Sequence, residues 1–324
     1  MKRLKNISTI ITIGIFALIL NATTPIFAQK SIIPTDSIEI SLLTCSPHDE
    51  IYSLYGHTAI RYKNYNTGED WVFNYGIFSF KKPFFVLRFA LGKTDYELGV
   101  VPFPVFKREY EKFGSQVVEQ VLNISNTEKL RIYNALNENY KPQNRIYRYN
   151  FFYDNCTTRA RDMIEKCLDG KITYPVENNV ISNTYREIIH EHTIRHPWAA
   201  FGNDLCLGLK ADIRTTAREQ QFIPSKLMHN VDYAQIYYNG KYKPLVKARN
   251  IVVDPGVQII EKGFPLSPTL CAVVFFAISL LITIIEYKKH TIYVWWDVLL
   301  MLILGSAGLV TTALLFSEHP TTST

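Results

Sequence analysis

Cysteine and complete metal-ligand motifs are scarce in this 324-residue chain. Its five cysteines form no CxxC pair, which argues against a zinc site and against thioredoxin-type chemistry. His190, His192 and His196 lie in HEHTIRH, which has HExH in place of the HExxH that zinc proteases use. No third ligand accompanies the two histidines that could share a helix face. We therefore predict neither a metal nor a cofactor.

Long runs of one charge are also missing. The formal net charge is +6, and no Lys/Arg run indicates nucleic-acid binding. Repeats and low-complexity tracts are absent as well. Because 47% of the residues are hydrophobic, the length allows one or two domains with real cores. We expect no nucleic-acid partner.

The N-terminus has the pattern of a secretory signal peptide. MKRLKN is basic, ISTIITIGIFALIL is apolar, and the next segment ends in the small residue Ala28. We predict a signal peptide over residues 1–28, with an uncleaved anchor as the alternative. Export permits a disulfide among Cys45, Cys167 and Cys206, and the sequence does not select the pair.

Two apolar runs follow near the C-terminus. Residues 266–285 carry no charge, residues 298–316 form a second run, and each is close to the roughly 20 residues that span a bilayer. The short link between them holds two lysines, and basic residues in such a loop mark the cytoplasmic side. The sequence therefore predicts a periplasmic domain over residues 29–255 and a transmembrane region over residues 256–324.

The outer domain mixes short strands with helices outside a doubly wound rhythm, which predicts an α+β fold. Asn-Thr-Gly turn chemistry joins strands 57–62 and 71–78 into a hairpin. Thr127 is expected to cap a helix over 127–140. Residues 240–265 have the composition of an extended linker. The other predicted elements are strands at 37–43, 115–124 and 145–153, and helices at 184–192, at 198–213 and from Cys156.

An aromatic run, FSFKKPFFVLRFALG, occupies residues 78–92. Such a run usually belongs to a core. A groove for an acyl chain and a contact with the membrane surface are the alternatives.

Cys156 stands at the start of a helical pattern in FFYDNCTTRARDMIEKCL. It shares one stripe with Ala160 and Met163, so it faces whatever the helix packs against. Asn155 or Asp154 can cap the first turn. A thiol at a helix N-terminus is favoured as the thiolate by the helix dipole, which predicts a nucleophile. A buried structural thiol is the alternative.

His57 is the candidate partner of this thiol. It follows Gly56 in YGHTAIRY and begins a strand-like run. A histidine on a strand beside the cysteine helix would supply a general base and keep the thiolate charged. A structural histidine is the alternative.

YSLYGHTAIRY, FNYGIF and FFYDNCTTRARD together resemble the Bacteroidota lipoprotein N-acyltransferase family. The resemblance covers most of residues 35–316. It implies a circularly permuted papain-like periplasmic domain followed by membrane helices in the inner membrane. It also implies a phospholipid acyl donor, a diacylglyceryl lipoprotein as acceptor, Cys156 as nucleophile and His57 as base. The family's membrane region has more helices than the two found here, so truncation after the second helix is an open alternative.

The site that the resemblance implies needs a third group to orient the imidazole of His57. Asn74 in FNYGIF is the first candidate, and Asp70 is the second. The Cys156 amide is a candidate for the oxyanion site.

Further candidate substrate-binding residues flank these positions. Tyr55 and Tyr52 are additional candidates for the oxyanion site. Arg61 and Arg159 could bind a phosphate head group, and ordinary ion pairing is the alternative for both arginines.

Two other functions use parts of the same pattern. A papain-like cysteine peptidase or amidase acting on cell-wall peptide needs the same pair of residues but gives no reason for the membrane helices. A non-catalytic envelope binding protein predicts an ordinary thiol pKa for Cys156.

Overall fold

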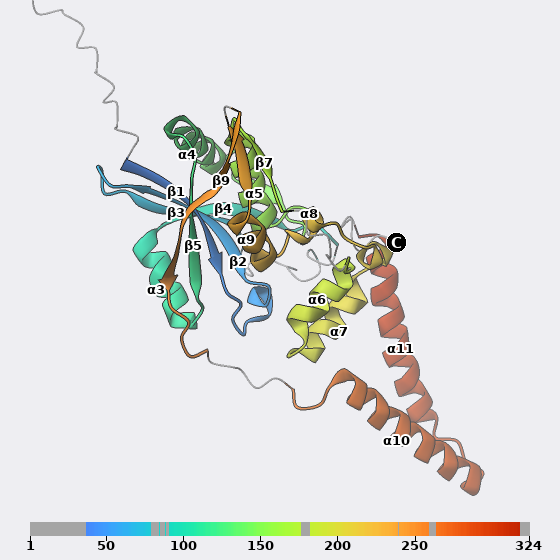
Figure 1. Ribbon diagram of the computed structural model, residues 1–324. Coiled ribbons are helices and arrows are strands. Elements are labelled where there is room, and N and C mark those ends of the chain that lie inside the picture. The colour runs from blue at the N-terminus through green and yellow to red at the C-terminus, as the bar shows by residue number, and fades with distance from the viewer. Residues whose placement is uncertain are drawn as a thin grey trace, which may run out of the picture. The chain divides into compact units, whose positions relative to one another are not determined.

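A seven-stranded antiparallel sheet carries the fold, with the strand order β10-β5-β1-β2-β3-β4-β6 (Figure 1). The computed structural model describes residues 37–78, 84, 88, 91–175, 182–238, 240–258 and 264–317. The strands of this sheet are β1 (Ile38–Cys45), β2 (His57–Asn64), β3 (Asp70–Ile77), β4 (Asp95–Pro102), β5 (Val117–Leu122), β6 (Ile146–Arg148) and β10 (Val246–Val253).

Both faces of the sheet are buried, and each has its own apolar core. Along β1, Ile40 and Leu42 point into the larger core, whereas Leu43 and Cys45 point into the smaller one. This alternation is the period of two that a strand imposes on its side chains. Since both sets are apolar, the central strands read as nearly continuous hydrophobic runs.

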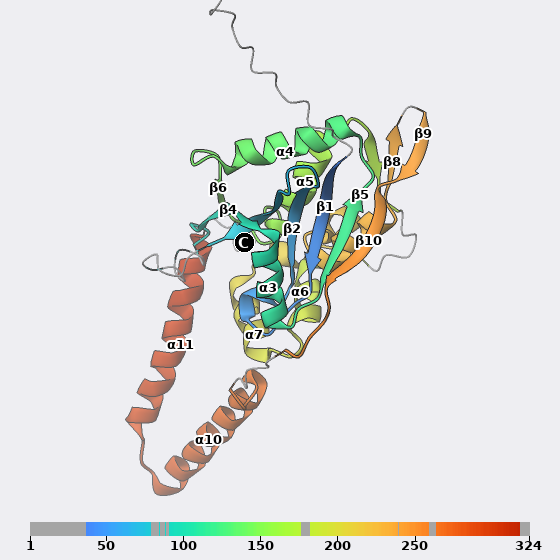
Figure 2. The same cartoon turned by 90° about the vertical axis from the view of Figure 1, so that its left-hand side faces the viewer.

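Helices cover the two faces unequally (Figure 2). One face carries α3 (Phe103–Phe113), whose Phe106 is buried against it. The other face carries α4 (Asn126–Tyr140), α5 (Cys156–Cys167) and α9 (Pro224–Asp232). The second face therefore holds the helix that begins at the candidate nucleophile.

A third apolar cluster joins the segment before α5 to the region after residue 182. It includes Phe152, Tyr185 and Phe222. The remaining elements before the C-terminal helices are η2 (Ile51–Ser53), α6 (Tyr185–Thr193), α7 (Pro197–Cys206), η3 (Leu209–Asp212), α8 (Ala217–Gln220) and a small sheet of β7 (Lys171–Thr173), β8 (Gln235–Tyr238) and β9 (Lys241–Pro244).

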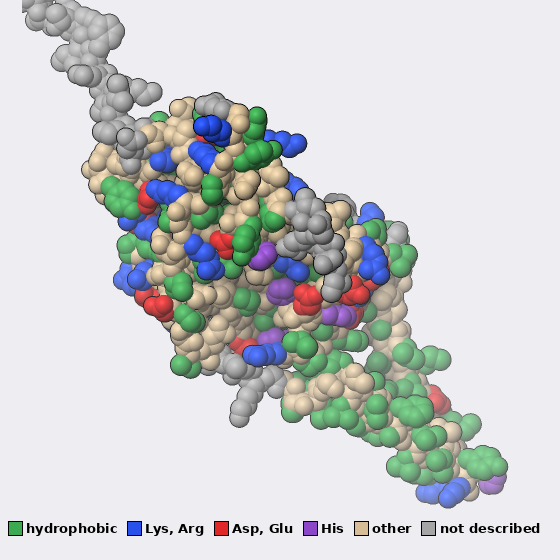
Figure 3. All heavy atoms as spheres, in the orientation of Figure 1, with side chains coloured by type: hydrophobic (Ala, Val, Ile, Leu, Met, Phe, Trp, Pro, Cys, Tyr) green, Lys and Arg blue, Asp and Glu red, His purple; other side chains and the backbone are tan. Residues whose placement is uncertain are grey.

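Two long apolar helices end the described chain. They are α10 (Pro268–Lys289) and α11 (Val294–Leu315), with mean hydropathies of 2.5 and 2.3. Hydrophobic side chains gather over both helices (Figure 3). Each has the length and composition of a candidate membrane span, and they coincide closely with the predicted runs.

The α+β prediction is confirmed, but several local predictions are wrong. Ser125 caps α4 in place of Thr127, because Ser125 and Glu128 form a capping box. The strand predicted at 145–153 ends at Arg148. The linker predicted at 240–265 contains β9 and β10, the latter pairing with β5 at the edge of the main sheet.

Other predictions fall partly or wholly outside the described residues, including the signal peptide and most of residues 78–92. All five cysteines lie in the described part of the chain, and all are free thiols. The disulfide that export permits among Cys45, Cys167 and Cys206 is therefore not formed in this structure.

Candidate active site

Asn155 fixes the first turn of α5. Its side-chain oxygen accepts hydrogen bonds from the amides of Thr157 and Thr158, each at 2.9 Å, and its own amide donates to Thr158 Oγ1 at 2.9 Å. Its side-chain nitrogen donates to the carbonyls of Phe151 and Phe222. Asn155 is thus the helix cap, and because it is buried with its amide groups satisfied, it holds the helix start rigidly.

The Cys156 amide remains as a free donor of this turn. The two amides that follow it are taken by Asn155. Within the described part of the chain, no group accepts a hydrogen bond from the Cys156 amide. A free amide at a helix N-terminus points toward a site that favours negative charge.

His57 begins β2 immediately after a turn that requires glycine. Gly56 has a φ of +80°, and a Cβ there would lie 2.6 Å from the Cys45 carbonyl oxygen. On the neighbouring strand, Asn74 Oδ1 lies 3.2 Å from His57 Nε2. Because an amide oxygen only accepts, this contact favours the tautomer with the proton on Nε2, which leaves Nδ1 to exchange a proton with a thiol. The structure brings Cys156, His57 and Asn74 together.

The electrostatics of this trio favour a thiolate–imidazolium pair. Burial alone would raise the pKa of Cys156, but the charge of His57, with hydrogen bonds from His57, the Thr58 amide and Thr157, lowers the pKa to about 7. Burial alone would lower the pKa of His57, but Cys156 and then Asn74 outweigh it and raise the pKa. A thiol with this pKa is substantially ionised at neutral pH, in contrast to the ordinary thiol that a binding protein predicts.

Gly76 keeps the chain close to the thiol. It lies in FNYGIF at an irregularity in the β3–β4 pairing and has a φ of +91°. A Cβ at this position would lie 3.6 Å from Cys156 Cβ. The bare backbone of Gly76 therefore leaves open the space beside Cys156 Cβ.

Three tyrosines that were not predicted as site residues lie close enough to Cys156 to feel its charge, and the hydroxyl of one of them, Tyr147, lies beside Gly76. Burial and then the charge of Cys156 raise the pKa values of Tyr96 and Tyr147, and burial, Tyr96 and Cys156 raise that of Tyr149. The Tyr96 and Tyr149 ring centroids are 4.1 Å apart. The alternating tyrosines of RIYRYNFFY were the available signal for Tyr147 and Tyr149, whereas Tyr96 lies outside that segment.

Arg61 and Asp70 lie elsewhere and bind each other. The guanidinium of Arg61 donates to both carboxylate oxygens of Asp70, at 2.7 and 2.6 Å, and to Glu119 at 2.9 Å. It also lies over the Phe103 ring, on the face that α3 covers. Asp70 is therefore not the group that orients His57. Ion pairing, and not phosphate binding, describes Arg61, because its charge is buried and matched.

Arg159 is also engaged in an ion pair. It donates from Nε and from one terminal nitrogen to Asp154, at 2.6 and 2.7 Å. Its guanidinium carbon lies 3.6 Å from the centroid of the Tyr147 ring. This arrangement supports the ion-pair alternative and makes Arg159 a neighbour of the site through Tyr147.

Tyr55 and Tyr52 have contacts of their own. The Tyr55 hydroxyl accepts from Asn203 at 2.9 Å, and its ring packs against Phe151 and His192. Tyr52 is 55% exposed, and its ring contacts His48. The contacts of the described residues do not bring either hydroxyl to Cys156, in contrast to the three tyrosines above.

The histidines of HEHTIRH are held by separate partners. His190 pairs with Asp204 at 2.9 Å, His192 Nδ1 lies 2.9 Å from the Ile188 carbonyl, and His196 pairs with Asp49 at 3.3 Å. Among the described residues, no group of three or more His, Cys, Asp or Glu side chains could hold a metal ion.

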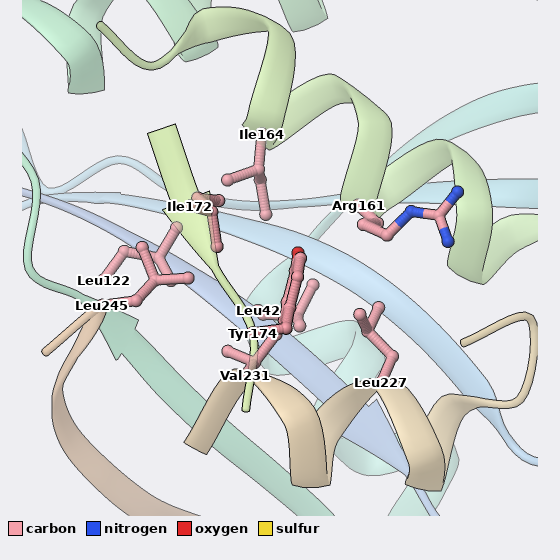
Figure 4. Close-up of a pocket in the computed structure, with 9 residues that line it drawn as sticks. All are labelled: Leu42, Leu122, Arg161, Ile164, Ile172, Tyr174, Leu227, Val231 and Leu245. Carbon is pink, nitrogen blue, oxygen red and sulfur yellow. The ribbon is translucent and has the colours of Figure 1, made fainter. Parts of the chain in front are cut away.

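A small apolar cavity lies between α5 and α9, away from the thiol (Figure 4). Its volume is about 10 Å³, which is room for one water molecule at most. It is therefore a packing defect of the larger core and not an acyl-chain site. Its lining residues are Leu42, Leu122, Arg161, Ile164, Ile172, Tyr174, Leu227, Val231 and Leu245.

Comparison with known proteins gives two matches to family models. Residues 28–191 match the Lnb N-terminal periplasmic domain, and residues 259–324 match the Lnb transmembrane domain. No curated protein and no solved structure matches the chain. The first match contains Cys156, His57 and Asn74, and the second contains α10 and α11.

Proposed function

Since the chain belongs to the Lnb family, as its motifs predicted, we propose that it is a lipoprotein N-acyltransferase that works through Cys156. The observation that carries the proposal is the trio of half-buried Cys156 and His57 with buried Asn74, in which His57 lowers the cysteine pKa to about 7. A nucleophile, a base and a group that orients the base are the parts that thiol acyl transfer requires.

The first half-reaction loads the enzyme. The Cys156 thiolate attacks the carbonyl carbon of a phospholipid ester, and the carbonyl electron pair moves to oxygen. When the C=O bond re-forms, the C–O ester bond breaks and His57 gives its proton to the departing alkoxide. The products are a lysophospholipid and an acyl thioester on Cys156. The free Cys156 amide can donate to the oxyanion.

The second half-reaction delivers the acyl chain. The N-terminal amine of a diacylglyceryl-modified lipoprotein attacks the thioester carbonyl, and neutral His57 accepts the proton that the amine loses. The C–S bond then breaks, so that the thiolate is regenerated beside an imidazolium. The lowered pKa of Cys156 makes its sulfur a good leaving group in this step.

A membrane location supplies proximity. The chain has a periplasmic domain and a transmembrane region, and both lipid substrates reside in a bilayer. Holding the enzyme in the same plane as donor and acceptor reduces the entropy cost of bringing three partners together. We place this plane in the inner membrane, with the catalytic domain in the periplasm.

Intact-mass analysis of the full chain tests the proposal directly. The detergent-solubilised protein is incubated with phospholipid vesicles. We expect a mass increase of one acyl group, mapped to Cys156 and absent from Cys156→Ala. Adding a diacylglyceryl-cysteine peptide should remove the adduct and yield the N-acylated peptide. A wild-type protein that never forms the adduct, or that cleaves muropeptides without lipid, would overturn the proposal in favour of a peptidase or amidase.

A further inference from the structure

The hydroxyl of Tyr147 is buried and has no hydrogen-bond partner among the described residues. Tyr147 is only 6% exposed and lies in β6, which pairs with β4 at the sheet edge. A buried hydroxyl without a partner destabilises a folded protein, and native folds keep few of them. An unpaired donor of this kind beside a nucleophile indicates a missing ligand.

This hydroxyl and Cys156 border the same position beside Gly76. A Cβ built on Gly76 would lie 3.6 Å from Cys156 Cβ and 4.0 Å from Tyr147 Oη. The absent side chain of Gly76 therefore leaves a gap with the sulfur-bearing residue on one side and the phenol on the other. Cys156 also carries the backbone amide whose hydrogen bond no described group accepts.

The ring of Tyr147 is held in place by its neighbours. The Arg159 guanidinium carbon lies 3.6 Å from its centroid, and Asp154 fixes Arg159 with two short hydrogen bonds. The ring of Tyr75 meets it edge-on at 6.2 Å. A donor fixed in this way needs no reorganisation when charge develops beside it.

The hydroxyl also keeps its proton at any working pH. Burial, and then the charge of Cys156, raises the pKa of Tyr147 well above its ordinary value. The phenol is therefore always a hydrogen-bond donor, never an anion that would repel the thiolate.

We propose that Tyr147 is a second oxyanion donor, which acts with the Cys156 amide on the carbonyl oxygen of the acyl ester. This inference rests on the proposed acyl transfer. When Sγ attacks, the carbonyl π pair becomes the oxyanion, and the Tyr147 O–H donates to it without giving up its proton. When the carbonyl re-forms, the hydrogen bond weakens again. Tyr147 thus stabilises both tetrahedral intermediates and takes no part in proton transfer.

Tyr147→Phe in the full chain tests the assignment with three measurements. The rate of Cys156 acylation by a fatty-acid p-nitrophenyl ester should fall about 100-fold or more, the usual effect of losing one oxyanion donor. Alkylation of Cys156 by iodoacetamide passes through no oxyanion, so its rate should not change. The thermal unfolding midpoint should stay the same or rise, because no existing hydrogen bond is lost.

Tyr75→Phe is the matched control. Its hydroxyl donates to Asn139 Oδ1 at 2.7 Å, so this variant should lose stability and keep both rates. Unchanged acylation in Tyr147→Phe would overturn the assignment, and so would an equal fall in acylation and alkylation, which indicates a structural role. The ester probe does not depend on phospholipid, so it separates this result from the proposed function. If wild type reacted with the ester but not with phospholipid, the proposed function would fail and the result for Tyr147 would still stand.

Discussion

Two polar clusters lie on the same sheet, and they differ in whether their hydrogen-bonding capacity is used. Around Arg61, the guanidinium is matched by Asp70 and Glu119. Around Cys156, one backbone amide and one phenol find no acceptor among the described residues. In the first cluster, which we call the closed cluster, the charges of Arg61, Asp70 and Glu119 are paired within the protein, and the cluster stabilises the fold. In the second, which we call the open cluster, these two donors remain unpaired where the proposed oxyanion would bind.

Removing His57 should produce the largest effect on the open cluster. In His57→Ala, burial would act on Cys156 without the opposing charge of His57. The pKa of Cys156 should therefore rise from about 7 to above the ordinary value of 9.0. At pH 7 the thiolate fraction, and with it the iodoacetamide labelling rate, should fall by at least about 50-fold. Acyl transfer should fall about 10²–10⁴-fold, because the general acid–base group is lost as well.

The pH profile of labelling checks this directly. Wild type should show a rate that rises with pH with a midpoint of about 7. For His57→Ala the midpoint should move upward. A midpoint that stays where it is in the variant would contradict the pairing of these two residues.

Arg61→Met should break the closed cluster without touching the open one. The substitution leaves Glu119 and Asp70 without their countercharge, and Glu119 is largely buried. We expect a loss of about 3–5 kcal/mol in the free energy of unfolding. Denaturant titration measures this loss. The midpoint of Cys156 labelling should remain at about 7, whereas a shift would show that the two clusters are coupled.

Asn155→Ala should have a smaller effect, and it tests the boundary of the open cluster. The variant loses the helix cap and the bonds to the Phe151 and Phe222 carbonyls. Caps of this type contribute about 0.5–2 kcal/mol to stability. Asn155→Asp retains the cap but cannot donate, so it should recover only part of the loss in a thermal melt. Full recovery would show that the two carbonyl bonds contribute nothing.

The closed cluster also shows why part of the site escaped sequence analysis. Cys156, His57 and Asn74, which the structure brings together, could be proposed from the sequence because each lies in a short motif with recognisable local chemistry: a capped helix start, a glycine turn and the adjacent strand. Arg61 was given a substrate role because its partners come from other segments, and Glu119 is 58 positions away. Strand register between distant segments cannot be read from composition.

Tyr147 was missed for a related reason. Its place beside Cys156 depends on the pairing of β6 with β4 across about 50 residues of chain, and β6 has only three residues. The segment containing β10 was taken for a linker because edge strands tolerate polar, exposed residues such as Lys247 and Arg249. Short and exposed strands leave weak hydrophobic periodicity, so their positions follow from the sheet and not from the segment itself.

Two of the positive-φ glycines have a practical consequence for searching genomes. Gly56 stands one position before His57, and Gly76 stands two positions after Asn74. Both backbone conformations resist replacement, so each glycine is tied to its reactive neighbour by geometry. A search pattern that requires Gly-His, then Asn-x-Gly, then Asn-Cys would specify the residues of the proposed site and the two glycines beside them. It could separate sequences that retain the machinery from those that retain only the scaffold.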